Sequence, residues 1–225
     1  MPTTAMVVAH RLVGPLVRRL LRPHVDGLEH VPRRGGVLLA ANHVSNLDNY
    51  LLSSVSPRPP WYLGKRELAR GLFGAFNIAM GMVPVDRGAG DQTAVERLVA
   101  LLGSGEVVAM FPEGTRSPTG ELFRFRSGTA RVACAANVPV VPVGLLGTAQ
   151  VWPRGGRPRL RRPAPHTLAV RFGPPLPPPA EGGRARREWT RALRTSVAAL
   201  TGQPIADTVL RVRPGDVDAD DIGAP

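Results

Sequence analysis

A histidine and an aspartate stand close together in the segment 42–48 of the chain, at His43 and Asp48. A histidine can remove a proton near neutral pH, and an aspartate that accepts its second N–H fixes the tautomer and stabilises the imidazolium. The pair therefore predicts general-base chemistry without a protein nucleophile. A His-x4-Asp spacing also arises by chance in a chain of 225 residues, so a purely structural histidine is the alternative for this pair taken alone.

A second polar segment, 111–117, reads Phe-Pro-Glu-Gly-Thr-Arg-Ser and follows an apolar run. Gly114 would let a substrate approach the backbone closely. The planar guanidinium of Arg116 is suited to bind a phosphate. Glu113 is expected either to hold that arginine or to bind a substrate hydroxyl. The alternative for this segment is a plain surface turn with a local ion pair.

The elements that must position these residues follow from the hydrophobic pattern. A turn-forming cluster at 32–36 separates two predicted strands, 25–31 and 36–41. Short apolar runs predict further strands at 61–63, 82–85, 106–111, 138–146 and 168–172. Periodic segments predict helices at 91–102, 127–137 and 184–200. Strands that alternate with helices indicate an α/β fold with a largely parallel central sheet, in which active sites collect at strand ends. We expect one domain over residues 24–202.

The two ends of the chain differ from this domain. Apolar residues recur every four positions from Val8 to Leu20, flanked by arginines, so residues 1–23 are predicted to form an amphipathic helix that is bent or started near Pro15. Such a helix either lies on an anionic membrane surface or packs against the core. The acidic segment 203–225 is predicted to be a disordered tail.

The composition and charge of the chain limit the classes of molecule that it is expected to bind. The formal net charge of +12 would suit nucleic acid, anionic lipid or a phosphorylated substrate. The arginine-rich segment 154–162 lacks interleaved aromatic residues and no nucleic-acid motif accompanies it, so we expect no nucleic-acid partner. No apolar run is long enough for a spanning helix and no secretory signal is evident, which predicts a cytoplasmic protein, peripheral on the inner face of the cell membrane.

Taken together, the segments 42–48 and 111–117 resemble two sequence blocks of the glycerophosphate and lysophosphatidate acyltransferase family. Its first block is Asn-His-x4-Asp and its third is Phe-Pro-Glu-Gly-Thr-Arg-Ser, and both match here in full and in order. The second block resembles 83–87 more loosely, because Pro84 is not typical there, and the fourth resembles 138–143. The segment 62–68 resembles the stretch in which the family often carries a lysine, here Lys65.

The resemblance implies an enzyme that moves a fatty acyl group from acyl-CoA or acyl carrier protein to the free hydroxyl of 1-acyl-sn-glycerol 3-phosphate, giving phosphatidic acid. His43 and Asp48 would act as the general base, with no covalent intermediate, no metal and no other cofactor. The residues implied in substrate binding are Lys65, Arg87, Glu113, Gly114, Thr115 and Arg116. Two alternatives remain open: another lysophospholipid or specialised lipid as the acceptor, or a non-enzymatic module that binds anionic lipid.

Overall fold

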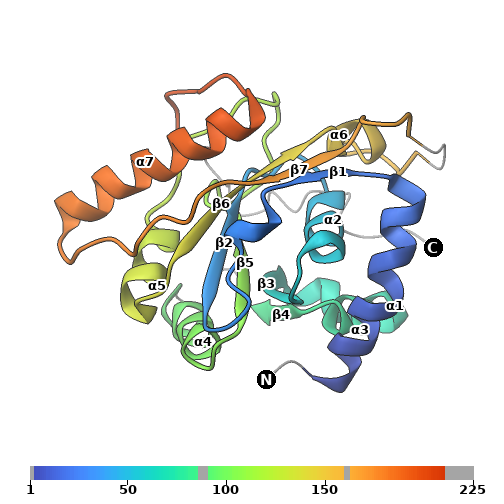
Figure 1. The fold of residues 1–225 in the computed structure, drawn as a ribbon, viewed down its shortest axis with the longest axis horizontal. Helices are drawn as coiled ribbons and strands as arrows, with labels where there is room; N and C mark the ends of the chain where they lie inside the picture. Colours follow the sequence, from blue (N-terminus) through green and yellow to red (C-terminus); the bar gives the residue numbers. More distant parts are fainter. Residues whose placement is uncertain (1–2, 86–90, 160–162, 211–225) are drawn as a thin grey trace.

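The centre of the molecule is a seven-stranded sheet with the strand order β1-β7-β6-β2-β5-β3-β4. The computed structural model describes residues 3–85, 91–159 and 163–210 (Figure 1). All neighbouring strands pair in parallel except β6 and β7, which are antiparallel. The predicted α/β fold with a largely parallel sheet is confirmed. The strands are β1 (His24–Asp26), β2 (Val37–Ala41), β3 (Pro60–Lys65), β4 (Met82–Val85), β5 (Val107–Met110), β6 (Val140–Leu146) and β7 (Ala169–Phe172).

Helices cover both faces of the sheet. The described helices are α1 (Thr4–Leu21), α2 (Leu47–Val55), α3 (Gly71–Ala79), α4 (Asp91–Gly103), α5 (Gly128–Ala136), α6 (Thr148–Val151) and α7 (Gly183–Thr201). In Figure 1, α4, α5 and α7 lie on one side of the sheet, whereas α1, α2 and α3 lie on the other. A separate hydrophobic cluster fills the space on each side.

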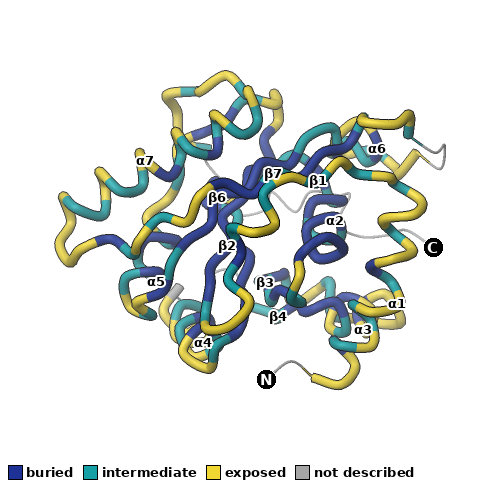
Figure 2. The backbone as a smooth tube through the Cα atoms, in the orientation of Figure 1, coloured by how far each residue is buried: buried dark blue, intermediate teal, exposed yellow. Residues whose placement is uncertain are grey.

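Strand β2 lies near the middle of the sheet, between the two layers of helices. All five of its residues are fully buried, as expected for a central strand with helices on both faces (Figure 2). Alternate side chains enter opposite clusters: Leu39 packs on the side of α2, while Leu38 and Ala40 pack on the side of α4 and α5. The segment that carries His43 therefore starts from a fully buried central strand.

The strand predicted over 25–31 is confirmed only for residues 25 and 26 and is wrong from residue 27 on. Strand β1 ends at Asp26, and a 3-10 turn (Leu28–His30) follows. Gly27 between them has φ 73°, and a Cβ there would lie 2.0 Å from the carbonyl oxygen of Phe172. The chain can turn so close to β7 because that position is a glycine.

Helix α1 runs from Thr4 to Leu21 without a break and includes Pro15, which neither starts nor ends it. The Thr3 hydroxyl caps its first turn by accepting the Met6 N–H at 3.2 Å. Its buried residues are Met6 and Gly14, and the helix packs against α2. None of the described helices is long and apolar enough to span a membrane.

Residues 203–210, which we expected to belong to the tail, lie along the segment 122–124. The Leu122 N–H donates to the Pro204 carbonyl at 2.8 Å, and the Ala206 N–H donates to Leu122 at 3.1 Å. These backbone bonds form an extended pairing that the acidic composition of the predicted tail as a whole did not reveal. Residues 211–225, the rest of the predicted tail, lie outside the described residues.

Candidate active site

The predicted site residues follow the carboxyl ends of neighbouring strands. His43 comes two residues after β2, the segment 111–117 comes directly after β5, and Lys65 is the last residue of β3. Because β2, β5 and β3 are parallel neighbours, these ends meet at one edge of the sheet. Arg87 lies outside the described residues, although β4, the strand before it, ends at the same edge.

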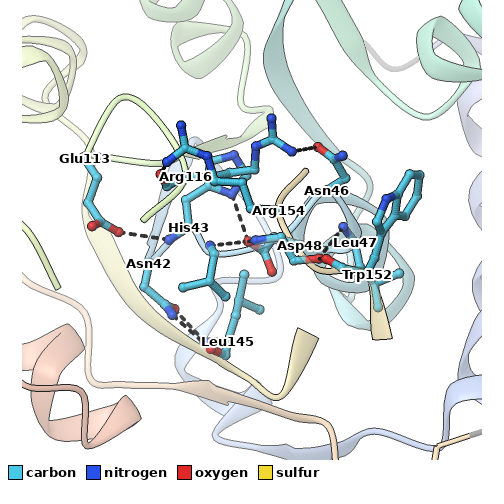
Figure 3. A network of polar contacts seen from close by, with 12 residues as sticks. Asn42, His43, Asn46, Leu47, Asp48, Glu113, Arg116, Leu145, Trp152 and Arg154 are labelled. Carbon is cyan, nitrogen blue, oxygen red and sulfur yellow. Dashed lines mark hydrogen bonds and ion pairs between the residues drawn. The ribbon is translucent and has the colours of Figure 1, made fainter. Parts of the chain in front are cut away.

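His43 and Asp48 form a close pair. The His43 Nδ1 atom lies 2.8 Å from Asp48 Oδ2, which also accepts the backbone N–H groups of Val44 and Ser45 at 2.8 Å (Figure 3). Asp48 is fully buried in the first turn of α2, whereas the His43 side chain is 15% exposed. The carboxylate is therefore positioned by three polar contacts, directly beside the imidazole nitrogen that it faces.

The ring of His43 is fixed from a second direction. It stacks on Phe111, with ring centroids 4.0 Å apart and planes 22° from parallel. Since Nδ1 points at Asp48, Nε2 is the nitrogen on the far side of the ring from the carboxylate. The arrangement suits proton removal by Nε2 from a molecule that approaches from outside.

The loop that bears His43 is tied to its surroundings by Asn42 and Ser45, which were not among the predicted site residues. Asn42 exchanges two hydrogen bonds with the backbone of Leu145 on β6, at 2.9 and 2.7 Å. The Ser45 hydroxyl donates to the Trp152 carbonyl at 2.6 Å and accepts the N–H of Leu47 at the start of α2. Asn42 stands directly before the histidine in the first sequence block, which is the one signal that could have identified it.

Glu113 connects the histidine loop to the second polar segment. Its Oε1 accepts the His43 backbone N–H and its Oε2 accepts that of Phe123, each at 3.0 Å. The residue is 1% exposed, and burial raises the pKa of its carboxyl to about 7, although both backbone N–H groups lower it. The structure thus places Glu113 as a brace between two loops, where we had expected a contact with arginine or substrate.

Gly114 and Thr115 form the turn after Glu113. Gly114 has φ 77°, and a Cβ on it would lie 2.8 Å from Nε of Arg126. Its N–H donates to the carbonyl of Phe111 at 2.9 Å, which closes the turn. Gly114 is exposed and Thr115 is half-buried, so this turn presents backbone at the surface of the site.

Arg116 turns back toward the histidine loop. Its Nη1 donates to Asn46 Oδ1 at 2.6 Å, and its carbonyl accepts from Arg154 at 3.0 Å (Figure 3). The next residue, Ser117, donates its N–H to the His43 carbonyl at 2.7 Å. Arg116 is 4% exposed, so its guanidinium is held in place before any ligand arrives. The structure therefore brings the two sequence blocks together through backbone and side-chain bonds.

Comparison with known proteins agrees with this arrangement. The Acyltransferase family profile matches residues 22–146. The 1-acyl-sn-glycerol-3-phosphate acyltransferase of Pseudomonas aeruginosa is 30% identical over 88% of this chain and 76% of its own length. The human 1-acyl-sn-glycerol-3-phosphate acyltransferase alpha is 32% identical over 70% of this chain, which spans 56% of that relative. The chain spans 38% of a chloroplastic Arabidopsis thaliana relative with the same activity in its name.

A solved structure has the same fold. The 1-acyl-sn-glycerophosphate acyltransferase PlsC from Thermotoga maritima superposes with a TM-score of 0.67 and 22% sequence identity. The match covers 88% of this chain and 81% of that protein. The sheet and its flanking helices are thus shared over most of both chains.

Proposed function

Because the chain belongs to the Acyltransferase family, we propose that it moves a fatty acyl group from a thioester to the free hydroxyl of 1-acyl-sn-glycerol 3-phosphate. The donor would be acyl-CoA or acyl carrier protein, and the product would be phosphatidic acid. Relatives named for this activity match along most of the chain, which supports the choice of acceptor. The observation that carries the chemistry is the pair of His43 Nδ1 and Asp48 Oδ2 at 2.8 Å.

In this proposal His43 removes the proton of the acceptor hydroxyl through Nε2. Asp48 keeps the proton of the imidazole on Nδ1 and stabilises the imidazolium while the hydroxyl oxygen attacks the thioester carbon. The tetrahedral intermediate collapses when its C–S bond breaks, and the thiolate takes the proton from Nε2. The acyl group passes directly between the two substrates, without a covalent enzyme intermediate, a metal or a further cofactor.

Phosphate recognition in the proposal belongs to basic residues at the same edge of the sheet. Arg116 is held beside the His43 loop by Asn46, and Lys65 ends the strand next to β5. Arg87 is assigned the same role from the sequence resemblance. A guanidinium already fixed by protein contacts loses little freedom when it binds a phosphate. Gly114 and Thr115 would leave room for the glycerol backbone of the acceptor.

We propose that the enzyme works on an anionic membrane surface, peripheral on the inner face of the cell membrane. Helices α1 and α3 lie against each other (Figure 1). Both expose large apolar side chains. These side chains are Val8, Leu12, Leu16, Leu20, Leu72, Phe73, Phe76 and Ile78. Exposed arginines accompany those of α1, an arrangement typical of a helix in the headgroup region.

The substitution His43→Ala tests the proposal. We expect acyl transfer to fall by about 100- to 10,000-fold, the usual contribution of a positioned general base. The control is His24→Ala, because His24 also pairs with an aspartate, Asp26, at 3.0 Å but stands about half exposed at the surface. Binding to anionic vesicles should stay the same in both variants. Full transfer by His43→Ala would refute the general-base role of His43, whereas vesicle binding without any transfer by the parent would favour a module that only binds lipid.

A further inference from the structure

A basic cavity of about 850 Å³ lies between α5, α7 and the segments 124–127 and 205–207. It is not lined by His43, Asp48 or the segment 111–117. Asp207 is the one acidic residue among the described residues that line it. Its arginines are Arg124, Arg131, Arg186, Arg187, Arg191 and Arg194.

Most of these arginines come from one face of α7. Arg187 and Arg191 stand four residues apart, as do Arg186, Thr190 and Arg194, so the two rows run side by side along the helix. Leu193 is fully buried in the cluster that α7 covers. Since the apolar face of the helix is occupied by the core, its arginine face is directed into the cavity.

The wall opposite α7 is held firmly. Arg194 donates to the carbonyls of Leu122 and Ala206, which joins the helix to the paired segments 122–124 and 204–208. Burial lowers the pKa of Arg194, and the nearby Arg124 lowers it further, while Asp207 and Glu113 oppose the shift. Cations that crowd one another in this way are stabilised when an anion binds between them.

The cavity lies next to the catalytic loops. Phe123, the neighbour of Arg124, donates its N–H to Glu113, and the same carboxylate accepts the backbone N–H of His43. Helix α5 connects β5 to β6, and both strands are parallel to β2. The first residues of α5 therefore lie at the sheet edge that carries His43. Ser127, just before α5, lines the cavity.

We propose that this cavity binds the phosphate groups of coenzyme A when acyl-CoA is the donor. The inference rests on the proposed function, which requires a thioester to reach His43. Coenzyme A carries its phosphates at the end of a long flexible arm away from the thioester sulfur, so its phosphates bind at a distance from the reacting carbon. A site beside the catalytic loops but separate from His43 meets that requirement.

The shape and lining of the cavity favour a nucleotide over an acidic protein. Its volume falls within the range of small-molecule sites, about 300–1,000 Å³, and a concave site does not suit the convex surface of a folded partner. Phe125 and Ile205 add apolar contact that an adenine ring can use, and the hydroxyl of Ser127 adds a donor for a phosphate oxygen.

Equilibrium binding of coenzyme A tests the inference directly. In calorimetry, the double variant Arg187→Ala/Arg191→Ala should bind coenzyme A and adenosine 3′,5′-bisphosphate about 100-fold more weakly, since each arginine contributes roughly tenfold. Both residues are exposed, so folding should not suffer. The matched control is Arg33→Ala/Arg34→Ala, which removes the same charge from an exposed turn before β2. Equal affinity for coenzyme A in parent, variant and control would refute the proposal that this cavity binds it.

Kinetics separate this site from the proposed acceptor. The double variant should raise KM for acyl-CoA by a similar factor, with kcat and KM for 1-acyl-sn-glycerol 3-phosphate unchanged. If the parent does not acylate that lipid but binds coenzyme A through these arginines, the proposed function fails and the donor site stands. The double variant could instead bind coenzyme A normally but lose transfer from acyl carrier protein or lose vesicle binding. Either result would overturn the assignment of the cavity to coenzyme A.

Discussion

Glu113 offers a test of the site that depends on its burial. The carboxyl is 1% exposed and accepts a backbone N–H at each oxygen, from His43 and Phe123. Two opposing effects act on it: the hydrogen bonds favour the anion, whereas removal from water favours the neutral acid. Burial dominates and raises the pKa from 4.5 to about 7. The substitution Glu113→Gln replaces this titrating group with a neutral side chain of the same shape.

The sign of the effect follows from proton binding. A carboxyl with a raised pKa in the folded chain holds its proton more tightly there than in the unfolded chain. Its contribution is therefore fully present below pH 4.5 and is lost as the pH rises through about 7. The shift corresponds to about 3 kcal/mol of unfolding free energy. Glutamine does not titrate, so the variant should lack this loss.

Urea unfolding of parent and variant between about pH 4.5 and pH 8 measures the effect. The unfolding free energy of Glu113→Gln minus that of the parent should rise by about 3 kcal/mol across this interval. Glu29→Gln, which removes an exposed carboxyl, controls for the change in net charge. A difference that stays constant would show that the two backbone N–H donors offset burial, and one that falls with pH would show that they outweigh it. Either result would refute the reasoning.

Four further outcomes are expected. Asp48→Asn keeps an oxygen for His43 Nδ1 but removes the charge, so kcat should drop by about 100-fold with little change in the urea midpoint; an unaltered kcat contradicts this role. Arg116→Ala should lower kcat/KM for a phosphorylated acceptor by about 10- to 100-fold relative to a monoacylglycerol, and equal losses on both would argue against phosphate contact. Deletion of residues 1–22, or high salt, should reduce sedimentation with anionic vesicles, and equal partitioning would count against membrane contact by α1. Transfer rates should not change in EDTA, because the base and the thiolate leaving group require no metal; a loss restored by a divalent cation would contradict the mechanism.

The central strands were predictable because their own residues determine them. β2 and β6 are apolar runs that a sheet covered on both faces requires, and the structure places them at its centre. The end of β1 was not predictable in the same way. The chain turns at Gly27, close to the carbonyl of Phe172, a residue far away in the sequence. Contacts of this kind become visible only when the fold brings both segments together.

Helix α1 shows a different limit. Its apolar stripe was predicted, but the direction that the stripe faces was left open between membrane and core. The structure shows Leu12 and Leu16 more than half exposed, while Gly14 approaches the backbone of Ser54 on α2. Periodicity reports that a helix has an apolar side, but the partner of that side depends on neighbours elsewhere in the chain. Helix α3, whose Leu72 is 93% exposed, was not predicted at all.

At the site, the sequence predicted which residues are present more readily than it predicted what they contact. Glu113 was expected to act on an arginine or a substrate because a carboxylate in a motif suggests a charged or hydroxylic partner. Its partners are instead backbone N–H groups, and these are invisible in a sequence because every residue except proline carries one. Through that carboxylate, the loop that carries His43 and the segment beside the arginine cavity are bound to the same side chain. The geometry of Glu113 therefore matters to both halves of the proposed reaction, although it is buried away from solvent.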